Sequence, residues 1–478
     1  MDDLSWMDAH EQAELVRSGQ VAPAELVEAA IARIEEENPR LNAVIHPRFE
    51  RARREAAEPL GDGPFRGVPL LLKDLACQSE GDPYHCGSVF LKNARWRADH
   101  DTGFVGRFRE AGFVIVGRTN VPEFGLTITT EPIAYGPTRN PWDTQRSSGG
   151  SSGGSAAAVS AGLVPVAHGN DGGGSIRIPA GACGLVGLKP TRARVSQAPD
   201  MGEAWMGATV QGVLTRTVRD TAAVLDCIAG PVPGDPYVAP PLRRPLAAEV
   251  GADPGRMRVG FLDRPLLGGL NADPEAGRAI AATAGLLAAL GHSVEEAHPK
   301  ALEEEAFPGH FLNVVAAGTA RDLAFWAEKL GRSASEDEIE PVSAGLGAAG
   351  RALSAADYLA SMEWMYGYIR RMSHWWSDER FDMLLTPVVN GPPPPLGYLS
   401  DPTQGLFRTI AMLQYTAQFN VTGQPAVSLP LQWSADGLPM GVQLVAAYGR
   451  EDLLVRLASQ LEAAAPWRGR HPKLAATR

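Results

Sequence analysis

The sequence is most distinctive at residues 147–155, which read Ser147-Ser148-Gly149-Gly150-Ser151-Ser152-Gly153-Gly154-Ser155. By composition alone, such a run is typical of a flexible linker. Its surroundings argue against a linker. It leads directly into the helix-forming run Ala156-Ala157-Ala158-Val159, and a second glycine run, Gly172-Gly173-Gly174, ends at Ser175 before the apolar Ile176. A repeated glycine run between core-forming segments predicts ordered loops.

Outward from these loops, apolar runs alternate with segments of helical periodicity. The pattern predicts strands at 67–72, 113–116, 257–262, 293–296, 426–431 and 441–446, and helices at 102–111, 273–290 and 451–464. Such alternation is typical of a layered α/β fold. A chain of 478 residues fits either two packed domains or one large domain. We predict one α/β/α domain over residues 1–478, with a central mixed, mostly parallel sheet covered by helices.

Composition excludes several classes of function. A formal net charge of -11 disfavours binding to nucleic acid, because such binding needs clustered Lys and Arg side chains to contact the phosphates. No apolar run approaches the length of about 18 residues that a membrane span needs, so no membrane contact is expected. The four cysteines have neither disulfide-framework nor zinc-type spacing. Because the N-terminal residues also lack the pattern of a signal peptide, we expect a cytoplasmic protein.

The second glycine run suggests nucleophilic catalysis. A serine hydroxyl needs a base to remove its proton, and the attacked carbonyl needs donors for its developing negative charge. Consecutive glycines before Ser175 can aim backbone N–H groups at one point. Alone this is a weak signal, because glycine-rich turns before a serine are common.

The base is the second requirement of such a site. The nearest histidine, His168, is expected to be a structural residue at a strand end. Lys73 ends an apolar run, and a lysine removed from water loses part of its preference for the charged form. Ser-Lys variants of the catalytic triad exist. Taken alone, a lysine after a strand is more often a surface residue or an ion-pair partner.

The combination of these features resembles the amidase signature family. The resemblance extends over essentially the whole chain, and it is strongest between about residues 65 and 220 and again from Phe419 onward. It is carried by Gly67-Val68-Pro69, Lys73-Asp74, Gly117-Arg118-Thr119-Asn120, Gly149–Ala156, Gly169-Asn170-Asp171-Gly172-Gly173-Gly174-Ser175-Ile176-Arg177-Ile178-Pro179 and Cys183–Thr191. This pattern is long and highly specific.

The resemblance implies a Ser–cis-Ser–Lys triad. Ser175 would be the nucleophile, Ser151 a bridging serine on a cis peptide, and Lys73 the base. The backbone N–H groups of Gly172, Gly173, Gly174 and Ser175 would form the oxyanion hole. This sequence departs from many relatives at position 172, where they carry a bulkier residue, so the wall of the pocket is expected to open slightly.

Two charged residues flank the nucleophile. Asp171 and Arg177 are interpreted as residues that fix the glycine loop from behind. That both are ordinary ion-pair partners is an equally open interpretation.

Within the family, the chain is similar to bacterial hydrolases that open the cyclic dimer of 6-aminohexanoate and to their unassigned amidase neighbours. The likeness rests on Thr129–Pro132, Arg139–Trp142, Ala167–Asp171, Phe419–Ala426 and Val445–Asp452. It implies an amidase that hydrolyses the C–N bond of a linear or cyclic amide through an acyl-enzyme. The expected partners are a small-molecule amide and water, with a homodimer left open and no metal or cofactor.

The substrate pocket is expected to come from a variable region. The catalytic core is placed at about 65–220 and 419–465, and the variable region at about 300–420. Two or three of six aromatic residues there are expected to line the pocket: Phe325, Trp326, Trp364, Trp375, Trp376 and Tyr415.

Other functions remain as alternatives. The same motifs occur in ester, carbamate or aryl-acylamide hydrolases of the family and in the glutaminase subunit of a tRNA-dependent amidotransferase. A non-catalytic binding protein on this fold is disfavoured by the presence of Lys73, Ser151 and Ser175 together. Nucleotide binding has still less support, because the glycine runs match neither the G-x-G-x-x-G motif nor a P-loop.

Overall fold

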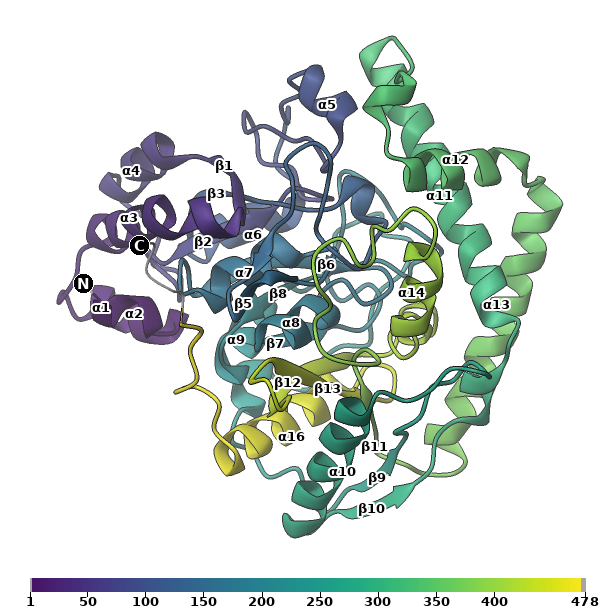
Figure 1. Cartoon of the computed structure of the whole chain (residues 1–478). Coiled ribbons are helices and arrows are strands. Elements are labelled where there is room, and N and C mark those ends of the chain that lie inside the picture. The colour runs from purple at the N-terminus through teal and green to yellow at the C-terminus, as the bar shows by residue number, and fades with distance from the viewer. Residues whose placement is uncertain (1, 474–478) are drawn as a thin grey trace.

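One mixed sheet organises the described chain, residues 2–473 of this computed structural model (Figure 1). Its eleven strands follow the order β1-β3-β2-β6-β8-β7-β12-β13-β11-β9-β10. The strands are β1 (Val44–Pro47), β2 (Pro69–Lys73), β3 (Val114–Thr119), β6 (Val166–Asp171), β7 (Val186–Lys189), β8 (Val210–Thr215), β9 (Arg258–Phe261), β10 (Ser293–Glu296), β11 (Met383–Pro387), β12 (Ala426–Trp433) and β13 (Pro439–Ala446). A separate ribbon pairs β4 (Arg139–Asn140) with β5 (Asp143–Ser147).

The strand directions correct one expectation, that the sheet is mostly parallel. Only the two ends carry parallel pairs, which join β2 to β3 and β6, and β9 to β10 and β11. The middle of the sheet, from β6 through β8, β7, β12 and β13 to β11, is antiparallel. Part of the reason is the short turn between β12 and β13, since a hairpin requires no crossover helix and joins antiparallel strands.

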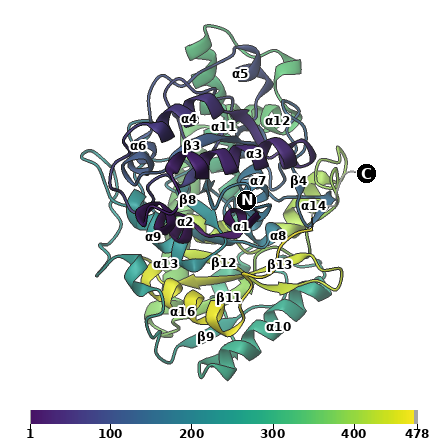
Figure 2. The same ribbon diagram turned by 90° about the vertical axis from the view of Figure 1, so that its left-hand side faces the viewer.

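Helices cover both faces of this sheet (Figures 1 and 2). They are α1 (Asp2–Trp6), α2 (Ala9–Arg17), α3 (Pro23–Leu41), α4 (Phe49–Ala57), α5 (Val89–Asn93), α6 (Gly103–Glu110), α7 (Gly153–Ser160), α8 (Arg177–Cys183), α9 (Val218–Ile228), α10 (Pro274–Ala289), α11 (Phe307–Leu330), α12 (Pro341–Ala352), α13 (Ala355–Ser377), α14 (Gly405–Met412), α15 (Ala417–Val421) and α16 (Glu451–Ala464). In Figure 1, α11, α12 and α13 lie at the edge of the molecule opposite the N-terminal helices.

The core is divided by the alternation of side chains along each strand. On β2, Leu70 and Leu72 pack in the cluster that includes α6, α9, α10 and α16, whereas Leu71 packs with α3, α4 and α7 on the other face. On β13, Leu444 belongs to the first cluster and Val445 packs with α11 and α13. The expected α/β/α layering is therefore confirmed, as one domain built on one sheet.

The serine- and glycine-rich run is part of the core. Residues 147–155 are all buried, which excludes the linker interpretation. The following helix α7 begins at Gly153, three residues before the first alanine, and lies beside β6 and β2. Among the described residues, no helix has the length and apolar character needed to cross a membrane.

The expected element positions hold to within a few residues. Helix α6 has Thr102 as its N-cap, α10 begins after the capping residue Asp273, and α16 spans the predicted 451–464. The strand predicted at 113–116 extends to Thr119 as β3. The Pro392–Pro395 run is partly buried and packs against the loop before Ser151, where Ser147 N–H donates to Pro394 O.

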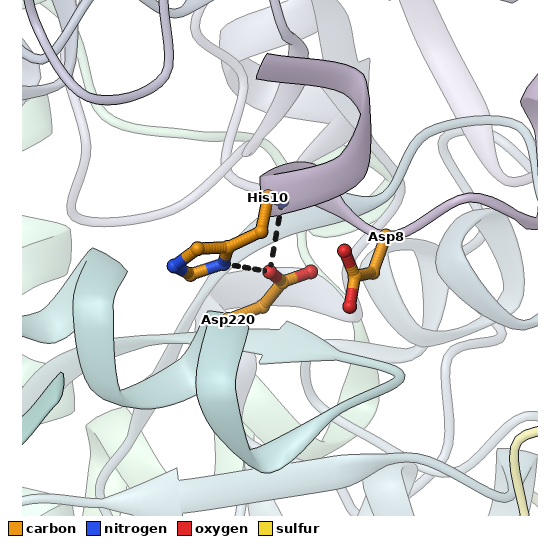
Figure 3. A group of neighbouring side chains, drawn as sticks. All are labelled: Asp8, His10 and Asp220. Atoms are coloured by element: carbon orange, nitrogen blue, oxygen red, sulfur yellow. Dashed lines mark hydrogen bonds and ion pairs between the residues drawn. The ribbon is translucent and has the colours of Figure 1, made fainter. Parts of the chain in front are cut away.

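A buried carboxylate attaches the N-terminal helices to the rest of the chain (Figure 3). Asp220 on α9 accepts from the backbone N–H groups of Ala9 and His10 at the start of α2, at 2.7 and 3.2 Å. Its Oδ1 also lies 2.6 Å from His10 Nδ1. Because the first N–H groups of a helix have no partner within it, Asp220 provides acceptors that α2 otherwise lacks.

Removing this carboxylate should destabilise the protein without touching the chemistry. Asp220→Ala leaves the N–H groups of Ala9 and His10 without their buried acceptor, which costs about 2 kcal/mol. We expect a lower melting temperature in calorimetry. Asp436→Ala, at an exposed position in the turn between β12 and β13, should leave it unchanged. Equal melting temperatures for the Asp220 variant and the parent would contradict this role.

Candidate active site

Strand β2 directs two adjacent charged groups to different places. Lys73 is the last residue of β2, and its side chain is fully buried. Asp74 follows it and pairs with Arg118 at 3.0 Å, while the N–H of His85 donates to the same carboxylate. Burial raises the pKa of Asp74, but its hydrogen bond to His46 and the charge of Arg118 outweigh burial and hold that pKa below its usual value. Asp74 is thus not the partner of Lys73, as the alternation of a strand predicts.

Lys73 has two polar partners, and neither is a carboxylate. Its Nζ donates to Ser151 Oγ at 2.7 Å and to Asn170 Oδ1 at 2.6 Å. Burial lowers its pKa to about 7, against a smaller opposing effect from the charge of Asp171. Near neutral pH, a substantial share of this amine is therefore uncharged and able to accept a proton.

Ser151 lies in the buried loop between β5 and α7. The peptide between Gly150 and Ser151 is cis, as the family resemblance implies. A Cβ on Gly150 would lie 2.7 Å from the backbone nitrogen of Thr129, so only glycine fits there. The next residue, Ser152, donates its N–H to Ser175 O at 3.2 Å and so joins this loop to that of the candidate nucleophile.

Ser175 follows β6 and precedes α8. Unlike Lys73 and Ser151 it is only partly buried, and its hydroxyl makes no hydrogen bond with residues 2–473. Gly174 before it has a φ of +136°, a conformation that residues with a side chain rarely adopt. Of the three candidate triad residues, Ser175 is thus the one that retains exposed surface.

Asp171 and Arg177 clamp this loop from behind. Both side chains are fully buried and pair at 2.9 Å. Asp171 also accepts from the N–H groups of Gly174 at 2.7 Å and Ile176 at 3.1 Å. Burial raises the pKa of Asp171, but the guanidinium of Arg177 outweighs burial and holds it well below the usual range. Of the two open interpretations, the structure favours residues that fix the loop, because the ion pair and the loop contacts share one carboxylate.

The clamp also corrects the expected set of oxyanion donors. The N–H of Gly174 points to Asp171 Oδ1 and is therefore engaged. Those of Gly172, Gly173 and Ser175 make no hydrogen bond with the described part of the chain. These three N–H groups are the donors left for a substrate oxygen.

His168 is not placed to act as the base. It is fully buried within β6, its Nε2 lies 3.0 Å from Gln211 Oε1, and its ring stacks on Phe104. Burial lowers its pKa to about 3, so the imidazole is neutral. The expectation of a structural histidine is confirmed, although it lies inside the strand and not at its end.

Three residues around the site had been assigned no role from the sequence. Asn170 accepts from Lys73 and donates to Leu75 O at 2.8 Å. Thr416 Oγ1 donates to Gly173 O at 2.6 Å, and Asn420 Nδ2 donates to Asp171 Oδ1 at 2.8 Å. Asn170 is adjacent to Asp171 in the quoted motif, which was an available signal. The contacts of Thr416 and Asn420 join residues over 200 positions apart, which no local pattern shows.

Of the six candidate pocket aromatics, three are core residues. Trp375, Trp376 and Tyr415 are buried in the core cluster beneath α11 and α13, where large apolar rings are needed to fill the layer. The assignment of the other three to the pocket stays a prediction: Phe325 and Trp326 pack with Tyr84 and Phe90, and Trp364 stacks on His310.

The aromatic residues that adjoin the glycine loop are Trp205 and Phe311. The opening expected at Gly172 is filled, because the ring of Trp205 occupies the space beside it.

One side-chain group has the composition of a metal site. Ligand atoms of Asp8, His10 and Asp220 lie within 4.8 Å of one another (Figure 3). Their acceptors are already used: Asp220 caps α2, and Asp8 accepts from Glu11 N–H and from Arg219 at 2.6 Å. This arrangement fits a structural joint between α2 and α9.

Comparison with known proteins gives a consistent result. A family model described as Amidase matches residues 25–455. The 6-aminohexanoate-cyclic-dimer hydrolase of Pseudomonas sp. (strain NK87) is 46% identical over 480 residues, covering 98% of this chain and 97% of the relative.

Solved structures agree with the sequence relatives. A 6-aminohexanoate cyclic dimer hydrolase complexed with substrate superimposes with a TM-score of 0.95 at 46% identity, covering 98% of this chain and 99% of the other. A bacterial aryl acylamidase of the amidase signature family superimposes with a TM-score of 0.87 at 28% identity, covering 97% and 99%. With a family match over most of its length and a relative of this identity, the chain belongs to the amidase signature family.

Proposed function

We propose that this amidase cleaves its substrate through an acyl-enzyme on Ser175, with Ser151 and Lys73 as the proton relay. The observation that carries the proposal is the hydrogen bond of 2.7 Å between Ser151 Oγ and the Nζ of Lys73, a fully buried lysine that forms no ion pair with a carboxylate of residues 2–473. The contact between Ser152 N–H and Ser175 O supports it, because it holds the two serine loops together.

In the first half of the reaction, Ser175 Oγ attacks the amide carbonyl carbon. Its proton passes to Ser151 Oγ as the proton of Ser151 passes to the neutral Nζ of Lys73. The carbonyl oxygen becomes negative and accepts from the N–H groups of Gly172, Gly173 and Ser175. The C–N bond then breaks as the proton returns along the same path to the leaving nitrogen.

The second half repeats these steps with water. Water attacks the acyl carbon, and its proton moves through Ser151 to Lys73. Collapse of the intermediate breaks the bond to Ser175 Oγ, which recovers its proton, and the carboxylic acid leaves. Asp171 stays charged throughout, because its pKa lies well below the working range, and keeps the loop fixed.

Cyclic amides of the 6-aminohexanoate type are the substrates we propose first. The support is the 46% identity, over 98% of this chain, to a hydrolase named for the cyclic dimer. We also propose that residues 65–220 and 419–465 carry the catalytic core and that 300–420 shapes the pocket. Lys73, Ser151, Ser175 and Asn420 fit the first assignment, and Phe311 fits the second.

Activity of the isolated chain distinguishes the proposed amidase from the alternative functions. A glutaminase subunit of an amidotransferase requires its complex, whereas the proposed enzyme hydrolyses amides alone. Activity of the purified chain on a panel of cyclic amides, linear amides, anilides, esters and carbamates separates these functions. No turnover of any amide by the isolated chain would contradict the proposal.

The nucleophile can be tested directly. Ser175→Ala removes the only group proposed to form the acyl-enzyme, so turnover should fall to below a few per cent while the melting temperature is unchanged. Mass spectrometry of the parent enzyme after treatment with a fluorophosphonate should place the adduct on Ser175. An adduct on another serine, or substantial turnover by the variant, would show that the nucleophile lies elsewhere.

The pH dependence of kcat/KM should report the protonation of Lys73. The relay needs the neutral amine, so protonation below its pKa removes activity. With a pKa of about 7, kcat/KM should fall about tenfold per pH unit below that value and level off above it. A rising limb centred near the pKa of a free lysine would contradict a neutral resting base. Circular dichroism across the range controls for unfolding.

A further inference from the structure

The ring of Trp205 is wedged between two glycines from distant parts of the chain. A Cβ on Gly172 would lie 2.9 Å from Trp205 Cζ3 and 3.0 Å from Cε3, on the six-membered ring. A Cβ on Gly318, in α11, would lie 2.6 Å from Cδ1 and Nε1, on the five-membered ring. The indole therefore reaches from the glycine loop of the active site to α11, and no side chain larger than hydrogen fits at either end.

An unusual backbone turn holds Trp205 in this place. Trp205 and Met206 both have positive φ, 52° and 60°, which costs roughly 1–2 kcal/mol per residue. The Met206 side chain is buried in the core, and Ala208 N–H donates to Trp205 O at 3.1 Å. Burial of Met206 thus anchors the turn while the adjacent ring projects toward Gly172.

A second aromatic ring, that of Phe311, lies next to Trp205 beside the glycine loop. Phe311 meets Trp205 edge to face, with ring centroids 6.4 Å apart and planes at 85°. Its Cζ would lie 3.6 Å from a Cβ on Gly173. Trp205 and Phe311, both partly buried, flank the two glycines whose N–H groups are the proposed oxyanion donors. A substrate group bound beside these donors must pass along two aromatic rings.

We propose that Trp205 is a specificity-determining residue that restricts the position beside Gly172 to slender, unbranched methylene chains. This inference rests on the proposed function, because it takes Ser175 as the reacting centre. Flat aromatic walls bury methylene groups well. Branched or aryl groups require volume that the indole already occupies. The substrate class is therefore amides of unbranched aliphatic chains.

The first test measures size selectivity by covalent labelling. The rates of inactivation by a linear-alkyl and by a branched or aryl fluorophosphonate are compared, with the adduct located by mass spectrometry. The parent should prefer the linear reagent, and Trp205→Ala should shift the ratio of rates at least tenfold toward the bulky one. Trp205→Leu, made in parallel in case the alanine variant fails to fold, should shift it in the same direction.

A matched control separates this role from a general loss of packing. Trp433, also partly buried, packs near Trp142 at the end of β12. Trp433→Ala should leave the labelling ratio unchanged. An unchanged ratio in folded Trp205 variants would overturn the inference while leaving the proposed function intact. Failure of both reagents to label Ser175 in the parent would instead overturn the proposed function.

The second test uses the contact with Gly172. Gly172 is not in the left-handed region, so alanine is compatible with its backbone and keeps its N–H. In the parent, Gly172→Ala must displace the indole, and kcat/KM should fall at least tenfold. In the Trp205→Ala background the same change should cost less than about threefold, because the ring is gone. Equal losses of kcat/KM in both backgrounds would contradict a direct contact between the indole of Trp205 and position 172.

Discussion

The proposed catalytic arrangement depends on a lysine, Lys73, that is buried without a counterion among the described residues. An exposed lysine is a cation at neutral pH and cannot accept a proton. Here β2 carries Lys73 into the interior, where Ser151 and Asn170 accept its hydrogen bonds and no carboxylate of residues 2–473 pairs with it. Burial lowers the pKa of Lys73 to about 7. The amine is thus available as a base only while the surrounding core excludes water.

The charged groups near Lys73 are paired, which limits their effect on its pKa. Asp74 is neutralised by Arg118, and Asp171 by Arg177, each in a fully buried pair. An unpaired carboxylate beside Lys73 would favour its charged form and raise its pKa. The Asp171 pair has a second effect, because its carboxylate also binds the N–H groups of Gly174 and Ile176. The same ion pair that limits the electrostatic influence on Lys73 therefore shapes the loop that carries Ser175, the proposed nucleophile.

Sequence patterns predicted the layers and most element positions, because periodicity is local. The triad of Lys73, Ser151 and Ser175 was implied by the family resemblance and stays a proposal, supported by the hydrogen bond between Lys73 and Ser151. Strand direction was predicted wrongly, since the antiparallel pairs in the centre of the sheet, apart from β7–β8 and the β12–β13 hairpin, join strands that are not adjacent in sequence. Trp205 was not identified from the sequence for a similar reason, because its position depends on contacts with the distant Gly172 and Gly318 and on an unusual turn. Sequence alone also did not show that the N–H of Gly174, which the resemblance assigned to the oxyanion hole, donates to Asp171. Motifs and the family resemblance indicated the candidate catalytic residues, whereas only the fold showed how their hydrogen bonds are shared.

The most direct test compares Lys73→Ala with the parent on an amide and an activated ester that share one acyl group. The amine leaving group needs the proton that Lys73 returns, whereas a phenolate leaves without it. We expect kcat/KM to fall about 1,000-fold or more on the amide and much less on the ester, with Ser151→Ala showing the same bias more mildly. Equal losses on both substrates would contradict the account, because Lys73 would then position the loop without moving the proton.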